Sequence, residues 1–218
     1  MKKTILLLFA IILSLSTFAG GKKVNITTSA DARIFVNGKD VASGATTIEV
    51  QKGAEVKVRV VKPGYITMDR VYIDNGTIKL PKADFFDLQK DPAFDASEGA
   101  ETANRDIDIT TNKTEDEAWR LLTQIVTGTF DVIEVNDKSS GYLRTAWTTK
   151  RFGAGSTIRT RLVVKLGNSN PLSYKVKILS EKAPAGTSST DDEKWESWDR
   201  LLKVYSEIIP ELQSRLNK

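Results

Sequence analysis

The segments IRTRLVVKL (residues 158–166) and LSYKVKILS (residues 172–180) decide the fold of the C-terminal half of the chain. In both segments apolar and polar residues alternate, which is the pattern of a β-strand with one buried face. The intervening GNSNP (residues 167–171) supplies Gly, Asn and Pro, which favour turns. We therefore expect two long antiparallel strands whose apolar face is covered by helices.

The polar face of these two strands is basic. Arg159, Arg161 and Lys165 alternate with the apolar residues of the first strand, and Lys175 and Lys177 with those of the second. We predict that this face binds an anionic partner, namely an anionic lipid surface, an acidic glycan or an acidic envelope protein. The alternative is an ordinary solvated face whose charges only discourage pairing between sheet edges. The full candidate set is Arg144, Lys150, Arg151, Arg159, Arg161, Lys165, Lys175 and Lys177.

Helices are expected on either side of these strands. Thr114 and Glu117 form a capping box at the start of the first helix, which carries an apolar stripe through Ile125. A second helix is expected from near Asp191 to the C-terminus, with Pro210 kinking or dividing it. Residues 105–218 are therefore predicted to form a helix-grip or TBP-like domain, an antiparallel sheet with helices on one face.

Part of this domain resembles the BamC family of outer-membrane assembly lipoproteins. The similarity is carried by TEDEAW (residues 114–119), FDVIEVND (residues 130–137) and GYLRT (residues 141–145). The resemblance implies a domain of the helix-grip shape. The chain contains no cysteine that could carry a lipid anchor, so neither the anchoring nor the assembly complex of that family is inferred.

The N-terminal half has the pattern of a small all-β domain over residues 22–82. Short alternating segments cover residues 24–26, 34–36, 48–50 and 56–60, and a further pair is expected at 71–73 and 77–80. The dipeptide Asn37-Gly38 is typical of a two-residue hairpin, because both positions require positive φ.

This half resembles a PEGA domain. The similarity is carried by ARIFVNGK (residues 32–39), TTIEV (residues 46–50), Gly53, VKVRV (residues 56–60) and KPGY (residues 62–65). The Pro-Glu-Gly-Ala motif of the family name is replaced by SADA at residues 29–32. The resemblance implies a small envelope-associated β-sandwich, similar to carbohydrate-binding modules, with no chemistry of its own. The fold class expected for the whole chain is therefore α+β.

Residues 1–19 have the features of a secretory signal peptide. Lys2 and Lys3 precede an apolar run at residues 5–13, and small residues follow as far as Ala19. The run is shorter than the roughly 20 residues that a spanning helix needs, and no later segment is long and apolar enough to cross a membrane. We therefore expect a periplasmic or secreted protein. The acidic stretch 83–104 is interpreted as a linker between the two domains.

The composition excludes several functions. The chain has no His and no Cys, so Ser-His-Asp and Cys-His hydrolases are excluded, as are the usual zinc and copper ligands. Removal of Lys2 and Lys3 leaves 30 basic and 28 acidic residues, a net charge of +2, and no stacking platform for nucleic acid is evident. We expect no cofactor, no metal and no nucleic-acid partner.

These observations predict an exported, non-enzymatic binding protein of the cell envelope. Two alternatives stay open at this point. One is a carrier that holds an apolar ligand between helix and sheet. The other is a carboxylate-based enzyme acting on glycans, which would need two converging acids.

The signal segment generates a direct prediction. Thr17 and Ala19 are small enough for the positions that precede a cleavage site, so the exported protein should begin at or near Gly20. N-terminal sequencing of the protein from its native source checks this. A membrane-embedded product that retains Met1 would instead make residues 5–13 an anchor.

Overall fold

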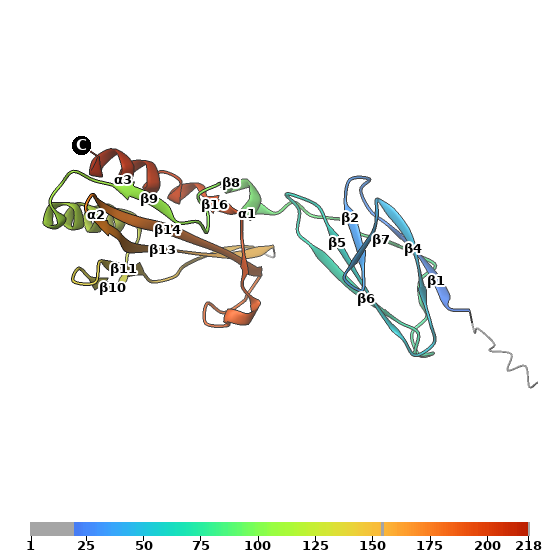
Figure 1. Ribbon diagram of the computed structural model, residues 1–218. Coiled ribbons are helices and arrows are strands. Elements are labelled where there is room, and N and C mark those ends of the chain that lie inside the picture. The colour runs from blue at the N-terminus through green and yellow to red at the C-terminus, as the bar shows by residue number, and fades with distance from the viewer. Residues whose placement is uncertain (1–19, 154, 218) are drawn as a thin grey trace, which may run out of the picture. The chain divides into compact units, whose positions relative to one another are not determined.

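The computed structural model describes residues 20–153 and 155–217 and divides the chain into two units (Figure 1). The first unit takes in the described residues up to Val61 together with residues 67–87, and the second takes in residues 62–66 and those from Leu88 onward. The chain is α+β and rich in sheet, as expected. The predicted signal segment, residues 1–19, lies outside the described residues.

The first unit contains two sheets. One has the order β4-β1-β7 and the other the order β3-β2-β5-β6. Strand β7 runs parallel to β1, and the remaining pairs are antiparallel. The strands are β1 (Lys22–Thr27), β2 (Arg33–Val36), β3 (Lys39–Ser43), β4 (Ala45–Val50), β5 (Glu55–Val61), β6 (Met68–Ile73) and β7 (Ala83–Phe85).

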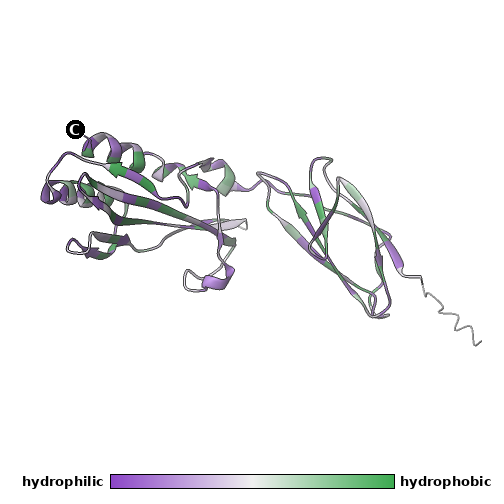
Figure 2. Ribbon diagram, viewed as in Figure 1, coloured by the Kyte–Doolittle hydropathy of each residue, from purple (hydrophilic) through white to green (hydrophobic). Residues whose placement is uncertain are grey.

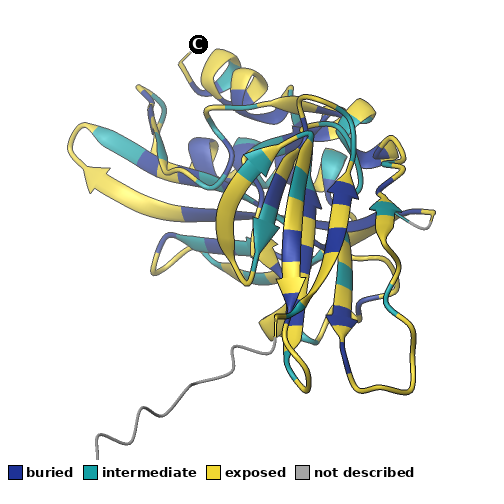
Figure 3. Ribbon diagram, turned by 90° about the vertical axis from the view of Figure 1, so that its right-hand side faces the viewer, coloured by how far each residue is buried: buried dark blue, intermediate teal, exposed yellow. Residues whose placement is uncertain are grey.

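Alternation of side chains builds the core of this unit. Val56, Val58 and Val60 of β5 are buried while the residues between them are exposed, and Figure 3 shows the same alternating bands along the strands. The predicted hairpin at Asn37-Gly38 is confirmed, since the two residues have φ of 48° and 80° and connect β2 to β3. The strand expected at residues 77–80 is absent from the structure. Asn75 Oδ1 instead accepts the N–H groups of Thr77 and Ile78, which forms a turn.

Residues 83–104 are not a loose linker. Residues 83–87 belong to the first unit and residues 88–104 to the second, where they form α1 (Pro92–Asp95) and β8 (Ser97–Gly99). Asp91 of this segment is engaged rather than solvated. Asp91 is 1% exposed and accepts hydrogen bonds from the Ala93 N–H (3.0 Å), Ser156 Oγ (3.1 Å) and Lys182 Nζ (2.6 Å). The local excess of acids indicated a spacer because the side-chain partners of Asp91, Ser156 and Lys182, lie 65 and 91 residues away in the sequence.

The second unit is built on a seven-stranded antiparallel sheet with the order β10-β11-β13-β14-β15, to which β12 adds on β13 and β9 on β14. Its strands are β9 (Ile107–Thr110), β10 (Ile133–Asp137), β11 (Tyr142–Thr145), β12 (Thr148–Phe152), β13 (Ser156–Ser169), β14 (Leu172–Pro184) and β15 (Glu196–Ser197). The helices are α2 (Glu115–Thr129) and α3 (Ile208–Leu216), and none of those described is long and apolar enough to cross a bilayer.

Both helices pack on the apolar face of this sheet. Leu122 of α2 and Leu212 of α3 are fully buried in one cluster with Ile158, Leu162 and Val176 of the long strands. Helix α2 begins with the predicted capping box, in which Thr114 and Glu117 each satisfy the other's backbone N–H. Figure 2 shows the hydrophobic bands that β13 and β14 contribute. The polar residues between these bands therefore face away from the helices.

The long C-terminal helix expected from Asp191 is wrong in its first half. Residues 192–205 form η1 (Asp192–Lys194), β15, β16 (Arg200–Leu202) and η2 (Lys203–Tyr205), and the helix α3 begins only at Ile208. Tertiary contacts hold the two short strands of this segment extended: β15 pairs with β14, β16 pairs with β8, and Arg200 Nε donates to Ser97 Oγ at 2.8 Å. Pro210 does not interrupt the helix. It lies in the first turn, where its missing N–H has no intrahelical acceptor to lose.

The first unit generates a pH-dependent prediction at Asp84. Burial tends to raise the pKa of Asp84, but hydrogen bonds from the Tyr72 hydroxyl (2.6 Å) and from Arg70 outweigh it and leave this pKa below its ordinary value. The stabilisation is therefore complete above about pH 4, the ordinary pKa of an aspartate, and is lost as the pH falls below that value. Asp84→Asn should lower the free energy of unfolding by about 2 kcal/mol at pH 7.

Urea unfolding of wild type and variant at pH 7 and at pH 3 checks this. The matched control is Asp69→Asn, which removes an exposed pair with Arg59 and should cost less than about 1 kcal/mol. A cost at Asp84 that equals the control, or that grows on acidification, would contradict the assignment.

Candidate functional site

The strand register places the candidate basic residues on definite faces of the sheet. In β13, Arg159, Arg161, Val163 and Lys165 lie on the face opposite the helices, since Ile158, Leu162 and Val164 enter the core. Directly paired residues share a face. Leu179, Lys177 and Lys175 of β14 pair with Arg161, Val163 and Lys165, while Arg144 and Tyr142 of β11 pair with Val163 and Lys165.

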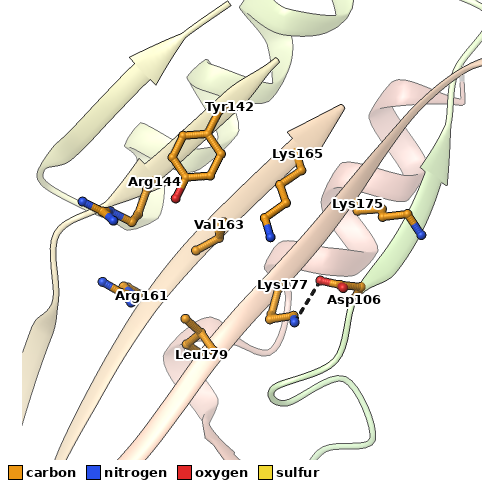
Figure 4. Close-up of a pocket in the computed structure, with 9 residues that line it drawn as sticks. All are labelled: Asp106, Tyr142, Arg144, Arg161, Val163, Lys165, Lys175, Lys177 and Leu179. Atoms are coloured by element: carbon orange, nitrogen blue, oxygen red, sulfur yellow. Dashed lines mark ion pairs between the residues drawn. The ribbon is translucent and has the colours of Figure 1, made fainter. Parts of the chain in front are cut away.

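These residues surround a hollow of about 240 Å³ on the sheet face, which we call the basic hollow (Figure 4). The side chains of Tyr142 and Lys165 extend toward Val163 at its centre, whereas Lys175 points away from it. The hollow contains five cationic side chains and one carboxylate. Its lining residues are Asp106, Tyr142, Arg144, Arg161, Val163, Lys165, Lys175, Lys177 and Leu179.

Carboxylates at the margins neutralise three of the five cations. All three pairs are at least partly exposed to solvent, so each contributes little to stability. Their effect is to confine the uncompensated positive charge to the middle of the hollow. The pairs are Arg144 with Glu134 (2.9 Å), Lys175 with Asp108 (3.3 Å) and Lys177 with Asp106 (3.1 Å).

Arg161 and Lys165 are the two cations that remain. Among residues 20–153 and 155–217, neither has a carboxylate within 4.0 Å. The guanidinium of Arg161 lies over the Trp147 ring, 4.2 Å from its centroid, and its buried Nε has no hydrogen-bond partner in the described structure. Burial lowers the pKa of Arg161 from its ordinary value, and the nearby charge of Arg144 acts in the same direction. The environment of Arg161 is thus one that an added anion would stabilise.

Arg159 is not available to a partner, although it lies on the same face. Its side chain is 4% exposed, and Nε donates to Glu181 at 2.6 Å while Nη1 donates to Asp192 at 2.7 Å. Its guanidinium also lies between the rings of Trp147 and Trp195, 4.3 and 4.5 Å from their centroids. The two carboxylates cancel its charge, so Arg159 holds the segment around Asp192 and Trp195 against the sheet.

Lys150 and Arg151 are also outside the hollow. Both lie on β12, paired with Ile158 and Thr157, and neither lines the hollow. Lys150 shares the register position of the core residue Ile158, and its Nζ lies 5.3 Å from the centroid of the Phe152 ring. The structure therefore brings together Arg144, Arg161, Lys165, Lys175 and Lys177, and separates Lys150, Arg151 and Arg159 from them.

Sequence reasoning missed two aromatic residues of this site. Tyr142 shares the face of Lys165 through strand pairing, and Trp147 contacts both Arg159 and Arg161. The alternation of β11 could have indicated Tyr142. Trp147 precedes β12 without belonging to a periodic segment, so no local signal marked it.

The acidic residues at the start of η1 also have identified partners. Asp191 bonds Lys194 at 2.6 Å, and Asp192 bonds Arg159. Among the described residues, no group of three or more His, Cys, Asp and Glu side chains is arranged to hold a metal ion.

The buried position of Arg159 generates a stability prediction. Arg159→Gln leaves Glu181 without its cation and removes the contacts of the guanidinium with the Trp147 and Trp195 rings, so it should lower the free energy of unfolding by about 3 kcal/mol. Tryptophan fluorescence during urea unfolding measures this loss. Arg151→Gln is the matched control on the neighbouring strand and should change the stability by less than about 0.5 kcal/mol. Equal effects of the two substitutions would contradict the structural role of Arg159.

No protein-family model matches the chain, and no curated protein matches it.

Proposed function

We propose that this protein is an exported, non-enzymatic component of the cell envelope that binds an anionic partner through the basic hollow. One observation carries the proposal: five cations from three adjacent strands line one hollow, and two of them lack a carboxylate partner among the described residues. Uncompensated positive charge in a hollow attracts anions. The partner is a glycan, an anionic lipid surface or an acidic envelope protein.

The chemistry of the lining residues favours binding over catalysis. Apart from one carboxylate, the polar groups of the basic hollow are two guanidiniums, three ammoniums and a phenol, all of which can donate hydrogen bonds to an anion. The single lining carboxylate, Asp106, is engaged by Lys177 at 3.1 Å. A glycan-acting carboxylate pair would need two acids facing the same space, and this hollow offers one.

The proposed domain assignments are consistent with this function. We propose that the first unit is a PEGA-like β-sandwich, supported by its two sheets and by the Asn37-Gly38 hairpin. We propose that the second unit is a helix-grip domain, supported by the packing of α2 and α3 on one face of the sheet. The space under the helices is filled by buried side chains such as Leu122 and Val164, which favours surface binding over transport of an apolar ligand.

Charge reversal tests the proposed function. Arg161→Glu with Lys165→Glu should lower the protein fraction that sediments with phosphatidylglycerol vesicles by about tenfold, because it inverts the two unpaired charges of the hollow. Wild-type binding should weaken between roughly 0.05 and 0.5 M salt, as charge screening requires. Neutral phosphatidylcholine vesicles should retain neither protein.

The control reverses two charges on β12, with Lys150→Glu and Arg151→Glu, and should retain more than half of the binding. Near-UV circular dichroism confirms that each variant is folded. Wild-type binding that does not change with salt would contradict the proposal. Equal loss of binding in the two double variants would contradict it as well.

A further inference from the structure

The net charge of the hollow, counted with the carboxylates that pair with its cations, determines the charge of the ligand that it can bind. Its five cations face three carboxylates, Asp106, Asp108 and Glu134, which leaves two positive charges. These two charges lie on Arg161 and Lys165 of one strand, on either side of Val163. Arg159, one position further on the same face, does not add to them because Glu181 and Asp192 both bond it.

Arg161 has the geometry of a preorganised donor. The Trp147 ring covers one face of its guanidinium, at 4.2 Å, so the edge of the guanidinium remains for hydrogen bonding. Its Nε–H is buried and has no acceptor among the described residues, so Arg161 carries an unsatisfied hydrogen-bond donor beside the hollow. A guanidinium edge offers parallel N–H groups that fit two oxygens of one phosphate or carboxylate group.

Further donors line the same hollow. The Tyr142 hydroxyl and Lys165 Nζ extend toward Val163 from β11 and β13 (Figure 4). Val163 is buried and apolar, so one wall of the hollow offers no polar group to an anion. Donors on several sides of a tetrahedral group can each reach a different oxygen, which a planar carboxylate with two oxygens cannot match.

The margins of the hollow select for a compact anion. Glu134 belongs to β10, next to β11, while Asp108 belongs to β9 and Asp106 directly precedes that strand, so acids border the cations on both sides. An anionic group that spreads beyond the centre of the hollow would lie next to these carboxylates. A small doubly charged group that enters the centre would meet Arg161 and Lys165 alone.

We propose that the basic hollow binds a single terminal phosphoryl group, a phosphate monoester, with Arg161 as its principal donor, Lys165 and Tyr142 as additional donors, and Trp147 as the residue that positions Arg161. This inference rests on the proposed anion-binding function and narrows it to one chemical class. Two negative charges on the ligand match the two unpaired positive charges. The monoester is carried either by a phosphorylated saccharide or by a lipid headgroup.

Isothermal titration calorimetry of the purified protein with phenyl phosphate tests the inference. Benzoate, which carries the same ring on a carboxylate, should bind at least about tenfold more weakly. Affinity for phenyl phosphate should rise between pH 5 and pH 7.5, because the second ionisation of a phosphate monoester lies near pH 6. Equal affinity for the two ligands, or no rise with pH, would overturn the inference.

Variants assign the roles of individual residues. Arg161→Lys keeps the charge but loses the paired N–H groups, and should weaken phenyl phosphate by about tenfold. Lys165→Gln, at an exposed position where folding is not at risk, should also weaken phenyl phosphate. Arg151→Gln is the control and should leave binding unchanged. Unaltered affinity in both Arg161→Lys and Lys165→Gln would overturn the assignment even if phenyl phosphate binds.

Vesicle-binding assays show which of the two sources carries the monoester. They also distinguish a failure of this inference from a failure of the proposed function on which it rests. Preference for phosphatidic acid over phosphatidylglycerol, at equal vesicle charge, identifies a lipid headgroup as the source. Binding of phenyl phosphate without that preference identifies a soluble or glycan-borne monoester. Salt-sensitive binding to phosphatidylglycerol, with no preference for phenyl phosphate over benzoate, would overturn the inference alone. If the protein binds neither phosphatidylglycerol vesicles nor phenyl phosphate, both this inference and the proposed function are overturned.

Discussion

The antiparallel pairing of β13 with β14 is the constraint on which the second unit depends. It runs from Ser156 opposite Pro184 to Ser169 opposite Leu172, with a register shift between Leu166 and Asn168. A one-residue slip of this register would exchange the two faces of the strands, placing Arg161 and Lys177 under the helices and Ile158 and Leu162 in water. Core formation and assembly of the basic hollow are therefore set by the same register.

Neighbouring aromatic and acidic residues determine which cations of the basic face remain unpaired. Trp147 contacts the guanidiniums of both Arg159 and Arg161, yet only Arg159 also has carboxylate partners. Adjacent positions on one strand thus have different roles: Arg159 is a buried structural cation, and Arg161 is a cation held without an acceptor. The carboxylates at the margins further restrict the free charge to Arg161 and Lys165.

The sequence indicated the strands and the basic face because both depend on local alternation. Residues 158–166 and 172–180 lie within β13 and β14, although β13 continues through residues 167–169 of the predicted turn, and the capping box at Thr114 starts α2. The burial of Arg159 could not be predicted, because it depends on Asp192 and Trp195 more than 30 residues away. The segment 192–205 was misread as helix for a similar reason. Its apolar spacing fits a helix, but pairing of β16 with β8 and of β15 with β14 holds it extended.

The central claim is that Arg161 is held unpaired and ready to donate to an anion, whereas Arg159 is not. The arginine Nε–Hε region of a ¹H–¹⁵N correlation spectrum tests this claim directly, with the two signals assigned from Arg161→Lys and Arg159→Lys variants. On titration with phenyl phosphate, the Arg161 signal should shift in a saturable manner while the Arg159 signal stays in place. A saturable shift of the Arg159 signal with Arg161 unmoved would contradict the account, as would the absence of any shift at Arg161.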